Sequence, residues 1–226
     1  MLKTINAGVF GYTSHQGLNQ LRKRILALRP DIITICYNWN DHAGANQMFG
    51  TGGKPWGKGV QKPDRDLPAA KRLGALAALS QLRIFQFLEN AILKAEANSA
   101  QADVDEKTIS ADLDSKIRRV PPEHYKENLR TMIQVARANE IMPVLLTQAF
   151  NPKQGPQRNI HREIQKKYNE MIIEVAENEN VLYVDPGPSL ETDASLFTSN
   201  THPSVRGHRK IARLIANALI HSLRSN

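Results

Sequence analysis

The stretch Asp31-Ile32-Ile33-Thr34-Ile35-Cys36-Tyr37 is a nearly continuous run of apolar and β-branched residues. A strand with one face in water alternates apolar and polar residues, whereas a strand buried on both faces of a parallel sheet does not. The run therefore predicts a buried parallel strand. Upstream, residues 18–28 carry leucines and an isoleucine at helical spacing and predict a helix that ends at Pro30. The apolar segment 4–9 predicts another strand, so the chain begins strand, helix, strand.

Helices and strands alternate again from residue 121 onward. The predicted elements are helix 121–139, strand 143–147, helix 160–177, strand 181–185 and helix 204–223. Parallel strands joined by helices form a sheet that is covered on both faces. The predicted fold class is therefore α/β, with a parallel sheet as the middle of three layers.

Residues 42–117 interrupt this alternation. The predicted order is a glycine- and lysine-rich loop at 42–66, a helix at 67–97 and a polar connector at 98–116. Gly50-Thr51-Gly52-Gly53-Lys54 lacks the spacing of a phosphate-binding loop, so we interpret the loop as a mobile lid rather than a nucleotide site. At about 150 residues per domain, the chain fits one domain, 1–226, with an insertion at about 42–117.

Composition and charge exclude several classes of protein. The chain is 41% hydrophobic and 23% charged, without a signal-peptide pattern or an apolar run of about 18 residues that would span a membrane. Its one cysteine, Cys36, excludes an internal disulfide framework and a cysteine-rich zinc site. The net charge of +8 is spread over several helices without a nucleic-acid-binding motif. We therefore expect a basic surface or a preference for anionic small molecules, and not a nucleic-acid partner.

Three segments stand at the carboxyl ends of predicted strands or close to them, where open parallel sheets bind their ligands. Gly8-Val9-Phe10-Gly11-Tyr12-Thr13-Ser14 is a glycine-containing turn that leads to a helix N-terminus, with Gln16 at capping-box spacing from Thr13. Asn38-Trp39-Asn40-Asp41 places two amides and a carboxylate after the buried strand. Ser199-Asn200-Thr201-His202-Pro203 places a histidine just before the last helix.

Each of these segments also has a purely structural explanation. Gly11 fits an ordinary turn, Asn40 fits a strand-end cap, and His202 fits a helix boundary. Taken together they fit a chemical role. A tetrahedral acyl-transfer intermediate needs hydrogen-bond donors, and its nucleophile needs a general base. The three residues would supply the donors and the base.

The same segments resemble the motif blocks of the SGNH/GDSL hydrolase superfamily. Residues 6–18 are similar to its second block, Asn38-Trp39-Asn40-Asp41 to its third, usually Gly-x-Asn-Asp, and Thr201-His202-Pro203 to its last, usually Asp-x-x-His-Pro. The helix that begins near residue 120 and the strand Leu145-Leu146-Thr147-Gln148 also resemble members of the group. The resemblance covers residues 1–41 and about 118–224.

This resemblance implies esterase, lipase, thioesterase or carbohydrate deacetylase chemistry on a flavodoxin-like three-layer fold. It implies that the Gly11 N–H and the Asn40 side chain line the oxyanion hole and that His202 is the general base. The expected substrate is a small-molecule, carbohydrate or lipid ester. No metal or organic cofactor is implied.

Two positions depart from the family pattern. The glycine of Gly-x-Asn-Asp is Asn38, which we expect to alter the loop more than the chemistry. The aspartate three residues before the histidine is Ser199, whose hydroxyl accepts a hydrogen bond but supplies no charge for an imidazolium. Asp185 and Asp193 are the alternative acids.

The nucleophilic serine of the family lies in a Gly-Asp-Ser motif after the first strand, and this sequence contains no such motif. Ser14 is the nearest hydroxyl, but its position fits a helix N-terminus. We therefore expect an N-terminally truncated member, without a nucleophile and inactive alone. In a flavodoxin-like strand order the missing first strand would lie between residues 4–7 and the strand at 31–37.

Two other functions stay open on the sequence. One is a non-catalytic α/β module that binds an acylated or anionic ligand, and the other is an acyltransferase. The region 42–117 carries no motif that identifies the substrate, and no motif addresses the oligomeric state.

Overall fold

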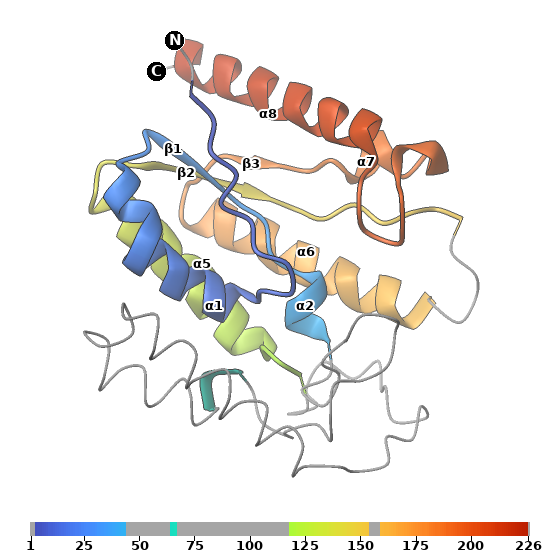
Figure 1. Cartoon of the computed structure of the whole chain (residues 1–226), viewed down its shortest axis with the longest axis horizontal. Coiled ribbons are helices and arrows are strands. Elements are labelled where there is room, and N and C mark those ends of the chain that lie inside the picture. Colours follow the sequence, from blue (N-terminus) through green and yellow to red (C-terminus); the bar gives the residue numbers. More distant parts are fainter. Residues whose placement is uncertain (1–2, 44–63, 67–117, 154–158, 226) are drawn as a thin grey trace, which may run out of the picture. The chain divides into compact units, whose positions relative to one another are not determined.

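A computed structural model describes residues 3–43, 64–66, 118–153 and 159–225 of the chain (Figure 1). It divides into two units: Met1–Asn40 with Pro122–Asn226, and Asp41–Pro121. The first unit contains a parallel sheet with helices on both of its faces (Figure 1). The three-layer α/β class predicted from the sequence is therefore confirmed.

Three parallel strands form the sheet, in the order β1-β2-β3. They are β1 (Ile32–Ile35), β2 (Met142–Leu146) and β3 (Tyr183–Val184). Thr34 of β1 pairs with Val144 of β2, and Leu145 of β2 pairs with Tyr183 of β3. All three coincide in position with strands that the apolar runs predict. The burial of β1 on both faces, which its apolar run also predicts, is wrong: of its four residues only Ile35 is buried, and no described strand pairs with its other edge.

Helices α5 (Pro122–Arg137) and α6 (Asn159–Asn178) pack together on one face of the sheet. Tyr125 of α5 and Tyr168 of α6 are fully buried and meet edge to face, with ring centroids 4.8 Å apart. Such aromatic pairs add specific geometry to a large buried apolar area. Helix α1 (Ser14–Gln20) packs against α5.

Helices α7 (Gly187–Leu190) and α8 (Val205–Ser225) lie on the other face (Figure 1). Side chains alternate between the two faces along a strand, and Val144 and Leu146 of β2 both point towards α8. Ile211 and Leu214 of α8 pack against them. In the described part of the chain, no helix combines the length and hydropathy of a membrane span.

The helix after the glycine turn is shorter than its apolar spacing predicts. Thr13 is its N-cap, and the Thr13 N–H donates to Gln16 Oε1 at 2.9 Å, which confirms the capping box. After Gln20 the backbone passes through a π-helical turn and a 3₁₀ turn, which ends at Arg29 with φ +47°. Because these turns change the number of residues per turn, the apolar stripe drifts, and Leu28 is 52% exposed.

The strand predicted at residues 4–9 is wrong. Residues 3–10 are exposed and none of them lies in a strand, and no described strand pairs with them. The Asn6 side chain accepts the Gly8 N–H at 3.0 Å, a local turn that competes with strand pairing. The Gln20 side chain donates to the Ala7 carbonyl at 2.9 Å and ties this segment to α1.

In the described part of the second unit, backbone hydrogen bonds join the first residues of the unit to the last. Val120 N–H donates to the Asp41 carbonyl at 3.0 Å, and Arg119 N–H donates to the Ala43 carbonyl at 2.9 Å. Arg119 also forms a salt bridge of 3.0 Å with Asp64, in a 3₁₀ turn at Asp64–Asp66. Most of the predicted lid loop at 42–66, the helix at 67–97 and the connector at 98–116 lie outside the described residues. The single domain with an insertion at about 42–117 stays a prediction.

Candidate active site

The turn from Val9 to Tyr12 depends on the backbone conformation of Gly11. Tyr12 N–H donates to the Val9 carbonyl at 3.3 Å, and Gly11 has a φ of +79°. This is the conformation of the third residue of a type II turn, which favours glycine. A Cβ built on Gly11 meets nothing within 4 Å, so the backbone angle and not crowding requires glycine here.

Asn40 is held against this turn. It lies in the short helix α2 (Trp39–His42), directly after β1, and its Nδ2 donates to the Tyr12 carbonyl at 3.1 Å. Because a carbonyl only accepts, this bond sets which end of the amide faces the turn. An amide nitrogen carries two hydrogens, and the second has no partner among the described residues.

Asn38, which stands where the family pattern has glycine, ties the end of β1 to α6. Its Nδ2 donates to Asn169 Oδ1 at 2.7 Å and to the Gln165 carbonyl at 2.9 Å. Trp39 N–H in turn donates to Gln148 Oε1 at 3.1 Å, in the loop after β2. These bonds fix the backbone that carries Asn40, in agreement with a structural effect of Asn38.

His202 lies on a closed loop between Phe197 and Pro203. These two residues form an antiparallel bridge, and the Thr198 N–H donates to the His202 carbonyl at 2.8 Å. Asn151, after β2, donates its backbone N–H to the Asn200 carbonyl at 2.7 Å. It also donates its side-chain amide to the Ser199 carbonyl at 3.2 Å. The loop is therefore anchored to the carboxyl end of the sheet.

The imidazole of His202 has different surroundings at its two nitrogens. Nδ1 lies 2.5 Å from Ser199 Oγ, whereas Nε2 has no hydrogen-bond partner within residues 3–43, 118–153 and 159–225. Phe10 stacks on the ring, with centroids 6.5 Å apart and planes at 18°. The Phe10 side chain is otherwise open, at 88% exposure. A histidine held at Nδ1 with a free Nε2 has the geometry of a general base.

One turn thus contacts both of the other candidates. Phe10 stacks on His202, Tyr12 accepts from Asn40, and Gly11 lies between them in the chain. Consecutive Cα atoms are about 3.8 Å apart, so the Cα atoms of Phe10 and Tyr12 are at most about 7.6 Å apart. The structure brings the predicted base and the predicted donors to the same turn, while their catalytic roles stay predictions.

The alternative acids do not bond to His202. Asp185 Oδ1 accepts from Thr147 Oγ1 at 2.5 Å and from the Gly187 N–H at 3.0 Å. Asp193 accepts from both the hydroxyl and the N–H of Ser195, and these two bonds, together with the nearby Arg206 and Lys210, lower the pKa of Asp193. Among the described residues, it is therefore the Ser199 side chain that hydrogen-bonds to the His202 imidazole.

Ser14 is not placed to act as a nucleophile. It is fully buried, and its Oγ accepts a hydrogen bond of 3.0 Å from Asn128 Nδ2 on α5. A nucleophilic hydroxyl must reach both its base and the substrate. In the described ranges no serine hydroxyl is hydrogen-bonded to His202 Nε2.

Phe10 and Asn151 were not singled out by the sequence motifs. Asn151 carried a usable signal, because it follows a predicted strand at its carboxyl end. Phe10 carried a weaker one, its position directly before the turn glycine. An aromatic cluster beside Asn40 was missed as well: the Trp39 ring lies 6.2 Å from Phe150 and 5.6 Å from His161, between centroids.

Comparisons with known proteins give a family and several similar solved structures. Over residues 1–210 the chain matches the family described as GDSL-like Lipase/Acylhydrolase. It resembles the crystal structure of Axe2, an acetylxylan esterase from Geobacillus stearothermophilus, with a TM-score of 0.52 at 18% identity, covering 95% of this chain and 70% of that one. A GDSL-like lipase from Bacteroides thetaiotaomicron has a TM-score of 0.52 at 14% identity, covering 94% of this chain and 73% of that one.

A comparison with curated proteins gives no match. At identities below 20% the two solved structures support the fold alone. The family match spans most of the sequence, including the turn at Gly11, the segment at Asn40 and the loop at His202. The chain belongs to the GDSL-like lipase/acylhydrolase family.

Proposed function

We propose that this site hydrolyses ester bonds by a serine-hydrolase mechanism. His202 is the general base, and the Gly11 N–H and Asn40 Nδ2 form the oxyanion hole. The observation that carries the proposal is the turn 10–12, which stacks on His202 through Phe10 and accepts from Asn40 through Tyr12. The hydrolase chemistry of the family supports the reaction class.

The proposed chemistry uses His202 Nε2 as the base, and the Asn40 amide and the Gly11 N–H as hydrogen-bond donors. His202 Nε2 takes the proton of a serine hydroxyl as that oxygen attacks the ester carbonyl, and it then protonates the leaving alcohol. The second N–H of Asn40 and the Gly11 N–H donate to the oxyanion that forms. Water repeats the sequence on the acyl-enzyme. One such donor is worth a factor of about 10²–10³ in kcat.

The substrate class is an ester of a carbohydrate or a lipid. The structural relatives are named as an acetylxylan esterase and a GDSL-like lipase. Phe10 is 88% exposed beside the proposed base, so its ring offers an apolar surface to the acyl or alcohol part of an ester.

We propose further that residues 1–226 alone have no appreciable esterase activity and that the nucleophile belongs to a strand beside β1. One edge of β1 pairs with β2, and no described strand pairs with the other. An unpaired edge leaves backbone N–H and C=O groups open to another strand, and Ile32 of β1 is 38% exposed, whereas the strands of parallel sheets are ordinarily buried. Because Asn40, just after the carboxyl end of β1, donates to the Tyr12 carbonyl, a parallel strand on that edge would end near the turn at Gly11.

The test compares hydrolysis of p-nitrophenyl acetate by three proteins. They are the 226-residue chain, the chain extended by the residues that its reading frame encodes upstream of Met1 (the extended chain), and the extended chain with His202→Ala. We expect turnover by the extended chain only. His202-dependent turnover by the 226-residue chain would show that the nucleophile has been misplaced. An inactive extended chain that carries a Gly-Asp-Ser motif would contradict the hydrolase roles.

A second candidate function is a non-catalytic module that binds an acylated ligand in the same place. The observation that favours it is the neutral hydroxyl of Ser199 at the imidazole, where the family pattern has a carboxylate. A stop codon immediately upstream of Met1, together with saturable binding of an acylated sugar by the 226-residue chain, would favour this reading over hydrolysis.

A further inference from the structure

Four basic side chains share one face of the first half of α8. The four are Arg206, Arg209, Lys210 and Arg213. Arg206 lies three residues before Arg209 and four before Lys210, and Arg213 lies four residues after Arg209, which places the four side chains on one side of a helix. All four are exposed. The opposite face of α8 packs on the strands through Ile211 and its apolar neighbours. Packing against the sheet therefore does not account for the basic face.

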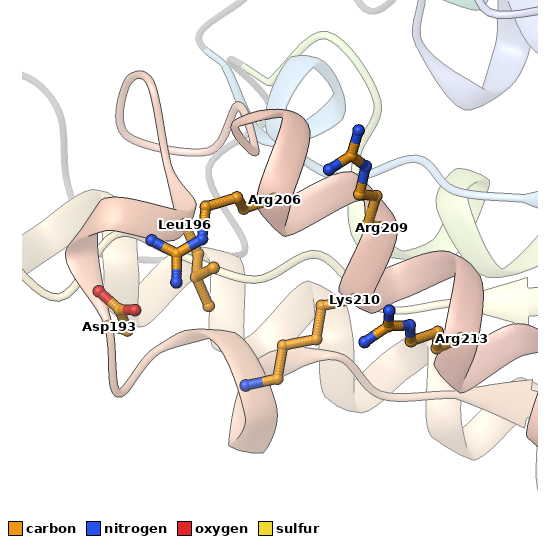
Figure 2. Close-up of a pocket in the computed structure, with 6 residues that line it drawn as sticks. All are labelled: Asp193, Leu196, Arg206, Arg209, Lys210 and Arg213. Carbon is orange, nitrogen blue, oxygen red and sulfur yellow. The ribbon is translucent and has the colours of Figure 1, made fainter.

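These four side chains border a hollow of about 310 Å³, together with Asp193 and Leu196. Figure 2 shows the four leaving α8, with Arg206 on the side of Asp193. A volume near 300 Å³ is at the lower end of the range of small-molecule sites. It accommodates an anionic group with a small organic part.

The charges around the hollow do not balance. Four cations and one carboxylate, that of Asp193, border the hollow, which leaves three positive charges. Lys210 Nζ donates to the Ser189 carbonyl at 2.5 Å, and Arg206 Nη1 donates to Ser195 Oγ at 3.3 Å, so both of these hydrogen bonds are to neutral groups. Arg209 and Arg213 have no hydrogen bond or ion pair with any described residue.

This arrangement is electrostatically unfavourable without a ligand. Arg206 with Lys210, and Arg209 with Arg213, are like charges one helical turn apart, which destabilises a helix. Cations near the N-terminus of a helix also oppose its dipole, and α8 has no acidic residue in its first turn. A bound anion would relieve both effects.

We propose that this hollow is a binding site for the phosphate group of a small phosphomonoester. A phosphate monoester carries close to two negative charges at neutral pH and three oxygens that accept hydrogen bonds. It matches the excess of three positive charges better than a single carboxylate does. Arginine guanidinium groups bind such oxygens in a bidentate manner, and Arg209 and Arg213 both have their donors available. The site contains none of the proposed catalytic residues and does not depend on the proposed ester chemistry.

The test measures the midpoint of thermal unfolding, Tm, of the 226-residue chain at constant ionic strength as inorganic phosphate or glycerol 3-phosphate replaces chloride. A ligand that binds only the folded state raises Tm as its concentration passes Kd. The variant is Arg209→Gln/Arg213→Gln. The matched control, Arg22→Gln/Arg24→Gln, removes two exposed arginines from another helical segment and makes the same change of net charge.

We expect a saturable rise of Tm with both phosphates in the wild type and in the control, and at least a tenfold weaker response in Arg209→Gln/Arg213→Gln. Without phosphate at low salt, Arg209→Gln/Arg213→Gln should have a higher Tm than the wild type, because it lacks the repulsion between like charges on α8. Equal phosphate responses in all three proteins would overturn the proposal. Binding to phosphatidic acid vesicles without any response to the two free phosphates would also overturn it, in favour of a membrane surface.

Discussion

Ser199 Oγ lies 2.5 Å from Nδ1 of His202, so a neutral hydroxyl occupies the position that a carboxylate has in the family pattern. A carboxylate only accepts, and it therefore enforces the tautomer with hydrogen on Nδ1 and a lone pair on Nε2. A hydroxyl both donates and accepts, and it permits either tautomer. The geometry of a general base is thus present without the charge that would commit it to that role.

Replacing Ser199 with aspartate should commit the imidazole to one tautomer. In Ser199→Asp we expect neutral His202 to carry its hydrogen almost entirely on Nδ1, as measured by ¹⁵N chemical shifts of the ring. Ser199→Asn is the uncharged control and should not produce the same shift. In the extended chain, Ser199→Asp should also raise kcat. An unchanged tautomer ratio in Ser199→Asp would show that the two side chains do not hold this contact in solution.

Because of the conformation of Gly11, we expect any side chain with a Cβ at that position to lower the stability of the fold. We expect Gly11→Ala to lower the free energy of unfolding by about 1–2 kcal/mol, because φ is +79° and alanine disfavours the left-handed region. Gly11→Asn should cost less, because asparagine tolerates this region. Urea unfolding measures both. Equal stability of Gly11→Ala and the wild type would contradict the turn geometry.

We expect replacement of Asn38 to lower the free energy of unfolding more than replacement of an exposed asparagine does. Asn38→Ala removes two hydrogen bonds to α6 and leaves the buried Gln165 carbonyl without this donor, which should cost about 1–3 kcal/mol. The control is Asn139→Ala, which removes an exposed bond to the Val135 carbonyl and should change stability by less than about 0.5 kcal/mol. Similar urea midpoints for the two variants would show that Asn38 does not tie β1 to α6.

The hydrogen bonds of Ser195 predict a pH effect at Asp193. They lower the pKa of this carboxyl below its ordinary value of 3.8, so the stability they contribute is present above that value and is lost as the pH falls through the folded-state pKa. In Ser195→Ala the pKa of Asp193 should rise, as followed by NMR of the carboxyl carbon. The wild type should then lose more stability than Ser195→Ala below pH 3.8. An Asp193 titration that is identical in both proteins would contradict this assignment.

The sequence predicts best where one short segment contains the whole signal. The strand at residues 32–35 follows from its apolar run, and the N-cap at Thr13 follows from Gln16 three residues later. The strand predicted at residues 4–9 failed because a strand requires a partner, which no local pattern reveals. There the Asn6 side chain forms a local turn instead.

The candidate site follows the same rule. Residue types and strand-end positions indicated Gly11, Asn40 and His202 without any knowledge of distance. The contacts that join them are between residues far apart in the chain, such as Phe10 with His202 and Asn151 with the loop at Ser199. Those contacts depend on the packed sheet, and a sequence motif does not encode them.

The most direct measurement of the central claim is the kcat of the extended chain for p-nitrophenyl acetate with Asn40 replaced by alanine. The account predicts a loss of about 10²–10³-fold with a small change in KM, because the amide stabilises the oxyanion and not the bound ester. Asn139→Ala, which removes an exposed amide far from this turn in the sequence, serves as the control and should keep full activity. A folded, His202-dependent enzyme whose kcat is unchanged by Asn40→Ala would contradict the account.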